Sequence, residues 1–128
     1  VVNNAANALA QPLGQMTPDA WTKSYSVNLQ GPVFLVQHAL PHLVQSPSAA
    51  VLNMVSVGAF NFAPALSIYA SAKAALMSVT RSMAAELASS DARCTVAIFH
   101  HPRFSSGEEH GDDVAMDPFW RMLHAAGA

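Results

Sequence analysis

Ser67-Ile68-Tyr69-Ala70-Ser71-Ala72-Lys73 is the stretch from which the fold and chemistry of this chain are best inferred. Its alanine content favours a helix, and positions i and i+4 share one face of a helix. The phenol of Tyr69 and the ammonium of Lys73 should therefore lie together. An ammonium beside a phenol favours the phenolate, which makes the phenol usable as an acid or base near neutral pH. The alternative interpretation is an exposed tyrosine and lysine on a surface helix.

The residues around this stretch predict a long helix between two strands. The helix should run from about Ser67 to about Ala88, because apolar residues recur at helical spacing on one side of it. The short apolar run Ala50–Val55 has the length of a buried parallel strand, and Arg93–Phe99 is a further strand candidate. Ser56 follows the first of these strands, at the edge of the sheet where catalytic groups gather in open α/β folds.

A second long helix is predicted over about residues 17–45. Thr17 is a suitable N-cap and Pro18 suits the first helical position. Gly31-Pro32 interrupts the pattern, since proline lacks an amide hydrogen and clashes with the preceding turn. We therefore expect a bend near Asn28 or a break into two helices.

The order of these elements predicts an α/β fold with a partial Rossmann-like parallel sheet of about three strands and two long helices. The first strand is the apolar opening Val1-Val2. The 128 residues suffice for one domain. A net charge of −2 with 11% charged residues argues against a nucleic-acid surface, and 52% apolar residues argue against disorder.

The cysteine count and the hydropathy predict where the protein works. Cys94 is the one cysteine, which suits a reducing cytoplasmic setting. No apolar run reaches the ~18 residues that a membrane span needs. The chain opens at Val1 in apolar sequence without a leader pattern, so we expect it to be part of a longer polypeptide.

Four features together resemble the short-chain dehydrogenase/reductase family. They are Asn3-Asn4-Ala5-Ala6 after a strand, Val27–Gly31 in an interrupted helix, Ser56 after the next strand, and the Tyr69 to Lys73 motif 13 residues beyond that serine. The resemblance covers residues 1 to about 99, as the C-terminal catalytic half of the family's Rossmann-like domain. Residues 100–128 are interpreted as a divergent tail, a loop with a short helix from Met116 to Ala126.

The resemblance implies a role for each matching position. Tyr69 would be the general acid in carbonyl reduction and the base in alcohol oxidation, and Ser56 would hold the substrate oxygen. Lys73 would assist Tyr69 and bind the nicotinamide ribose, and Asn28 would position a water in a proton relay. Asn4, Ala5 and Ala6 would lie beside the cofactor, with Asn4 fixing the strand end and Ala6 standing where the family has glycine. The implied cofactor is NAD or NADP, and the implied reaction interconverts a secondary alcohol and a carbonyl by hydride transfer.

The family's glycine-rich TGxxxGxG loop is absent from the sequence, and so is its Pro-Gly after the last matched strand. We therefore predict weak or no cofactor binding and no activity for the chain alone, so its status as an enzyme stays open. The alternative is a non-catalytic remnant that serves as an assembly domain. We expect an exposed apolar edge at Val1-Val2 and pairing of copies through the two long helices, as in the family. The substrate and the choice between NAD and NADP also stay open.

The histidines and phenylalanines offer further hypotheses. His38 and His42 lie four residues apart, with more histidines at 100, 101 and 110. The helical pair lacks the glutamate of an H-E-x-x-H motif, so we predict no metal site. Phe60 and Phe62 would either line a substrate pocket or pack in the core.

Overall fold

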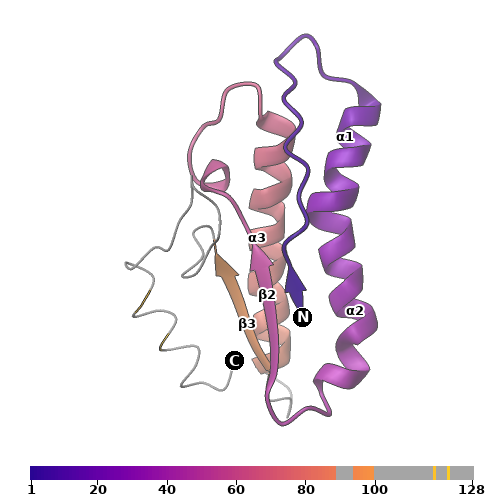
Figure 1. The fold of residues 1–128 in the computed structure, drawn as a ribbon, viewed down its shortest axis with the longest axis vertical. Coiled ribbons are helices and arrows are strands. Elements are labelled where there is room, and N and C mark those ends of the chain that lie inside the picture. Colours follow the sequence, from indigo (N-terminus) through magenta and orange to yellow (C-terminus); the bar gives the residue numbers. More distant parts are fainter. Residues whose placement is uncertain (89–93, 100–116, 118–120, 122–128) are drawn as a thin grey trace.

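A computed structural model describes residues 1–88, 94–99, 117 and 121. In chain order these residues form the elements shown in Figure 1: β1 (Val2–Asn3), α1 (Pro18–Tyr25), the π-helical segment η1 (Ser26–Gln30), α2 (Gly31–Leu43), β2 (Ala49–Met54), the short 3-10 helix η2 (Val57–Ala59), α3 (Ser67–Ala88) and β3 (Cys94–Phe99).

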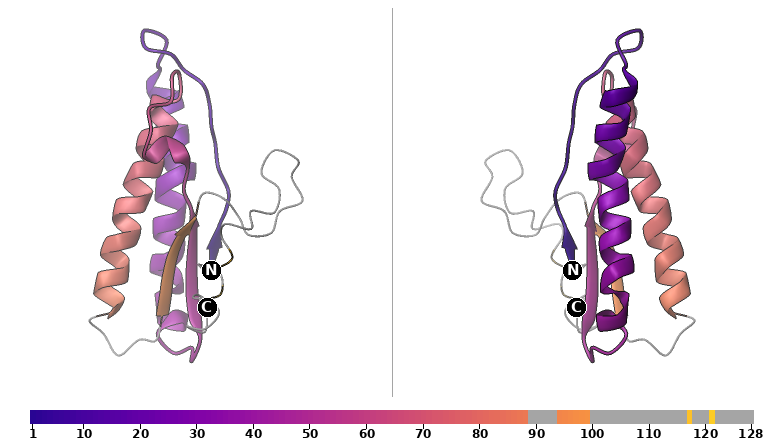
Figure 2. Two further views of the ribbon diagram at one scale, coloured as in Figure 1. Left: turned by 90° about the vertical axis from the view of Figure 1, so that its left-hand side faces the viewer. Right: turned by 90° about the vertical axis from the view of Figure 1, so that its right-hand side faces the viewer.

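The three strands form one parallel sheet in the order β1-β2-β3. Asn3 pairs with Asn53, and the register of β2 with β3 runs from Ala49 opposite Cys94 to Met54 opposite Phe99. Figure 2 shows both long helical elements on the same side of this sheet. Right-handed crossovers between parallel strands produce this arrangement. The predicted α/β fold, with three parallel strands and two long helices, is confirmed.

The first long helical element is continuous but contains a π-helical turn where we expected a bend or a break. The Thr17 side chain caps α1 by accepting a hydrogen bond from the Ala20 amide. The amide of Gly31 bonds to the carbonyl of Ser26, five residues back. Because Pro32 has no amide hydrogen to offer Asn28, the wider turn carries the chain past this point without ending the helix.

The core lies between β2 and the helices. Val36 and Leu43 of α2 pack with Ala49 and Val51 of β2, and Ala39 and Met83 lie against this cluster. Alternate residues of β2 are buried, as expected for a strand with one face against helices. Leu76 and Leu87 of α3 are also buried, which confirms the predicted apolar side of that helix.

Some of the segments predicted from the sequence lie outside the described residues. Arg93 lies outside them, and so does the predicted tail except Asp117 and Arg121, which are helical and form an ion pair of 3.0 Å. Among the helices that the structure describes, none is both long and apolar enough to cross a membrane.

Candidate active site

Ser56 lies directly after β2, at the carboxyl end of the central strand. It is buried, and its backbone is extended at the N-cap of η2. Its Oγ accepts a hydrogen bond of 3.2 Å from the Gly58 amide. No acceptor for the hydroxyl proton is found among the described residues, which leaves that proton available to a ligand.

Among the residues whose burial the structure describes, Lys73 is the largest fully buried side chain, with 1% of its surface exposed. From the second turn of α3 it reaches the sheet, where its Nζ donates to the Met54 carbonyl oxygen at 2.7 Å. Burial lowers the pKa of the ammonium below the usual 10.5, because desolvation disfavours the charged form. The alternative of a surface lysine is therefore wrong.

Tyr69 lies one helical turn before Lys73 and is half-buried. The Lys73 Nζ is 5.9 Å from the centre of the Tyr69 ring, so the two residues share a face of α3 as their spacing predicts. No hydrogen bond from the Tyr69 hydroxyl is found among the described residues. The structure thus brings Ser56, Tyr69 and Lys73 together at one end of the sheet.

Asn28, in the π-helical segment, is completely buried. Its Oδ1 accepts from the Asn7 amide at 3.1 Å, while its Nδ2 donates to the Asn7 carbonyl at 2.8 Å and to Ser24. The side chain therefore clamps the backbone of the loop that follows β1. The proton relay expected at Asn28 stays a prediction.

Asn3 joins the end of β1 to the central strand β2. Asn3 is buried and donates to the Asn53 side chain at 2.7 Å, whereas Asn4 is exposed. The role expected for Asn4 beside the cofactor stays a prediction.

Asn53 and Thr80 were missed by sequence reasoning. Asn53 donates to the Thr80 hydroxyl at 2.8 Å, and that hydroxyl donates to the Leu76 carbonyl at 2.6 Å. With Asn3 they form a buried polar chain from β1 through β2 to α3. An asparagine inside an apolar strand is the one signal in the sequence that indicates such a chain, since a buried amide needs partners.

The loop after β1 carries the predicted cofactor residues Asn4, Ala5 and Ala6, all of which are exposed. Farther along this loop, the Gln11 amide donates to the Ala65 carbonyl at 2.7 Å. The loop is therefore joined to the segment that leads into α3, close to Tyr69 in sequence. Both loops lie at the end of the molecule toward which β2 points (Figure 1).

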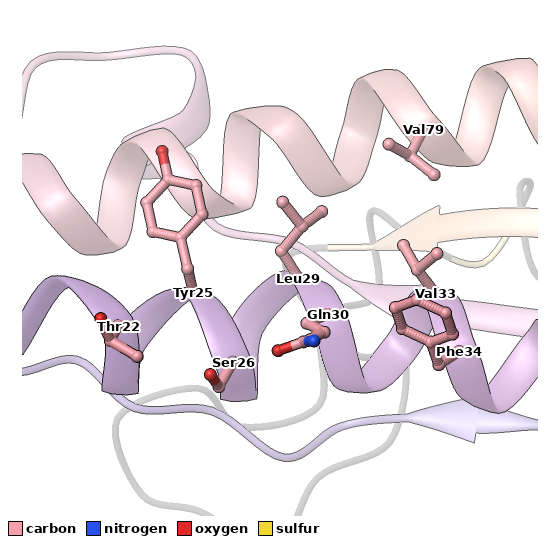
Figure 3. Close-up of a pocket in the computed structure, with 8 residues that line it drawn as sticks. All are labelled: Thr22, Tyr25, Ser26, Leu29, Gln30, Val33, Phe34 and Val79. Carbon is pink, nitrogen blue, oxygen red and sulfur yellow. The ribbon is translucent and has the colours of Figure 1, made fainter.

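A separate groove of about 450 Å³ lies between the first helical element and α3. Figure 3 shows Tyr25, Leu29 and Val33 pointing from α1, η1 and α2 toward α3. The Tyr25 hydroxyl donates to Ser71 Oγ at 3.0 Å, inside the Tyr69 to Lys73 motif. Tyr25 thus braces the helix that carries the motif, although nothing in its sequence spacing indicates this contact.

The remaining hypotheses concern the aromatic and histidine residues. Phe60 and Phe62 are 61% and 91% exposed, so packing in the core is wrong for both. His38 and His42 are exposed on α2, and no metal-binding group of three or more side chains occurs within the described ranges. His100, His101 and His110 lie outside those ranges.

Comparison with known sequences identifies the family. The sequence model described as short chain dehydrogenase matches residues 1–99. This chain belongs to that family. It is also 30% identical over 95 residues to an uncharacterized oxidoreductase of Staphylococcus aureus (strain MW2) and, equally, to one of Staphylococcus epidermidis. These matches cover 74% of the chain but 41% of each relative, so the chain spans about two fifths of their length.

Solved structures give the same assignment. A short-chain dehydrogenase from Streptomyces avermitilis is similar over 86% of this chain and 40% of its own, with a TM-score of 0.72 and 25% identity. ElxO with NADP bound matches over 77% of this chain and 40% of its own (TM-score 0.71, 26% identity). A 4-hydroxyisoleucine dehydrogenase complexed with NADH matches over 68% and 39% (TM-score 0.64, 26% identity). The chain is thus part of a Rossmann-like oxidoreductase fold.

Proposed function

We propose that this chain supplies the proton-transfer side of an NAD(P)-dependent oxidoreductase that interconverts a secondary alcohol and a carbonyl. The observation that carries the proposal is the convergence of Ser56, Tyr69 and Lys73 at the carboxyl end of β2, with the buried ammonium beside the Tyr69 ring. Two relatives of known structure have NADH or NADP bound, which supports a nicotinamide cofactor.

The proposed chemistry divides between the two hydroxyl groups. The Ser56 hydroxyl, for which the described part of the chain has no acceptor, donates a hydrogen bond to the substrate oxygen and holds it. Tyr69 gives its proton to that oxygen in reduction and takes one back in alcohol oxidation. The Lys73 charge favours the phenolate that remains after proton transfer. A nicotinamide cofactor supplies or accepts the hydride when it is bound.

The residues present fit one side of such a cofactor. Tyr69 and Lys73 offer donors for its ribose, and Asn4, Ala5 and Ala6 form an exposed stretch with small side chains. A pyrophosphate is held by the backbone amides of a glycine-rich loop at a helix N-terminus, and the 128 residues contain no such loop. We therefore propose that full affinity requires sequence beyond these residues.

Calorimetric titration with NADH and NADPH tests the cofactor part of the proposal. Affinity in the micromolar range would support an enzyme and exclude a non-catalytic remnant. The absence of heat at about millimolar cofactor, roughly 4 kcal/mol of binding free energy, would contradict the enzyme hypothesis for this chain and favour the assembly-domain alternative.

Turnover tests the role of Tyr69. In any preparation that reduces a ketone, Tyr69→Phe should lower the rate by at least about 100-fold, because it removes the proton donor. Tyr25→Phe is the matched control, since it removes a phenol hydroxyl that bonds to Ser71 outside the proposed chemistry. Equal losses in both variants would show that Tyr69 acts through folding alone.

We also propose that copies pair through the helical layer and that the protein works in the cytoplasm. Phe34 lines the apolar groove of Figure 3 and is about half-exposed, and the equally exposed Trp21 stacks on Tyr25 of the same groove, which supports a helical interface. Light scattering of Phe34→Glu should then report a monomer where the wild type is a dimer. The single cysteine supports a reducing compartment.

A further inference from the structure

The last residue of β2 is hydrogen-bonded to the helix that carries Tyr69. Met54 ends β2, and its carbonyl accepts the bond of 2.7 Å from the Lys73 Nζ. Ser56 follows Met54 by two residues, with a buried Val55 between them, and the Ser56 backbone is extended. An extended segment of this length has little slack. A bond that holds the Met54 carbonyl therefore also restrains Ser56.

The chain that follows Ser56 is held on the same helix. Ser56 begins η2, because its Oγ accepts from the Gly58 amide at 3.2 Å and its carbonyl accepts from the Ala59 amide at 2.9 Å. The turn packs on α3, since a side-chain carbon at Gly58 would lie in van der Waals contact, 3.5 Å from the Ala70 Cβ. Ala70 directly follows Tyr69. Ser56 is thus restrained on both sides by the part of α3 that carries the phenol.

The bond between Lys73 and Met54 has the properties of a strong tether. Hydrogen bonds with a charged donor are roughly twice as strong as neutral ones, and the Lys73 side chain is buried, so water competes little for the Met54 carbonyl. An ammonium has three N–H donors, and one bond to Met54 does not exhaust them. The same ammonium can therefore hold Met54 and still act at Tyr69, whose ring centre lies 5.9 Å away.

We infer that Lys73 is a positioning residue for Ser56, in addition to the role proposed for it at Tyr69. By tethering the end of β2 to α3, this one side chain sets the separation of the two hydroxyl groups that must reach the same substrate oxygen. Without the tether, Ser56 moves with the end of β2 while Tyr69 stays on α3. This inference rests on the proposed function, since it assigns a second task to a residue of that site.

NMR on the whole 128-residue chain tests the tether. In the wild type, a coupling across the hydrogen bond should connect the Lys73 Nζ with the Met54 carbonyl carbon. Lys73→Met removes the donor and keeps nearly the same side-chain length. The exchange rate of the Gly58 amide should then rise about tenfold relative to that of the Ala20 amide. Ala20 is the internal reference, because its amide donates to the Thr17 hydroxyl over the same 3.2 Å that separates Gly58 from the Ser56 hydroxyl.

Thr80→Val is the control variant, because it removes the hydroxyl that joins α3 to Asn53 of β2 and leaves the bond between Lys73 and Met54 in place. It should change the ratio of the two exchange rates by less than about twofold. The inference is overturned if the coupling is absent, if Lys73→Met leaves the ratio unchanged, or if Thr80→Val raises the ratio as much.

The cofactor titration separates this inference from the proposed function. A rise in the ratio that is confined to Lys73→Met, together with no binding of NADH or NADPH, would contradict the proposed reaction and leave the tether standing. Cofactor binding with an unchanged ratio would contradict the tether alone.

Discussion

The interior seam between the sheet and α3 differs sharply from the outer surfaces of the molecule. In the seam, Asn3, Asn53, Thr80 and Lys73 are all buried and all hydrogen-bonded. No buried side-chain nitrogen or oxygen among the described residues lacks a partner. The outer surfaces instead leave large apolar side chains exposed, on β1, on the helices and in the loops at the carboxyl end of the sheet.

The buried polar groups find their partners within the chain, whereas the exposed apolar groups do not. Buried polar groups without partners cost free energy, and here the chain satisfies them internally. Exposed apolar groups remain open to a ligand, a second copy or further polypeptide. We therefore expect substitutions in the seam to change stability and substitutions on the outer surfaces to change binding or association.

The largest stability effect should come from Asn53→Ala. The change removes the bonds of 2.7 Å and 2.8 Å to Asn3 and Thr80 and leaves a buried amide without a partner. We expect the free energy of unfolding to fall by about 3 kcal/mol in urea titrations followed by circular dichroism. The control Asn61→Ala, in an exposed loop, should cost less than about 0.5 kcal/mol. A loss below about 1 kcal/mol for Asn53→Ala would mean that the seam does not hold the sheet to α3.

Local patterns predicted the elements of the fold well. The helix from Ser67 to Ala88 and the strand near Ala49–Met54 follow from apolar spacing and length, which are local properties. The π-helical turn at Asn28 was not predicted, because proline indicates a disruption but packing decides whether the helix continues. A bend or a second helix would satisfy the same local rule.

The sequence predicted the residues of the site but not the hydrogen bonds that hold the surrounding loops and strands in place. Spacing along one helix brings Tyr69 and Lys73 together, so their proximity is visible in the sequence. The contacts of Asn28 with Asn7 and of Asn3 with Asn53 join residues far apart in the chain. They depend on strand register and loop path, which no local pattern specifies.

Lys73→Met should have the next largest effect, and that effect should depend on pH. The variant leaves the Met54 carbonyl without its donor but also removes a buried charge. Burial lowers the pKa of Lys73 below 10.5, so the unfolded chain binds more protons than the folded chain in the window just below that value. Wild-type stability should therefore rise with pH there, and its advantage over the variant should grow as the pH approaches 10.5 from below.

Urea titrations at several pH values check this sign. Lys23→Met is the matched control, because Lys23 is exposed on α1. It removes a lysine charge from the surface, so it separates the effect of burial from the loss of one charge. A wild-type advantage over Lys73→Met that shrinks as pH rises would contradict a lysine destabilised by burial.

A smaller effect is expected at Ala65, two residues before α3 begins. Ala65 has a φ of 62°, in the left-handed region that favours glycine. Ala65→Gly should stabilise the fold by about 0.5 kcal/mol in the same urea titrations, since relief of strain exceeds the added freedom of the unfolded chain. Ala8→Gly makes the same change in an exposed loop and should destabilise by a similar amount. Destabilisation by both variants would show that Ala65 carries no strain.

Val2→Lys should have the smallest effect on stability but should still weaken self-association in solution. Val2 is 64% exposed on β1, the outermost strand on its side of the described sheet. A lysine there should change the free energy of unfolding by less than about 0.5 kcal/mol, because the side chain buries little. A charge on an edge strand discourages pairing with another edge, so the growth of light scattering with concentration should weaken. Gln15→Lys adds the same charge in an exposed turn and should leave that growth unchanged. If both variants scatter like the wild type, association does not proceed through the β1 edge, and the helical groove of Figure 3 becomes the surface to test.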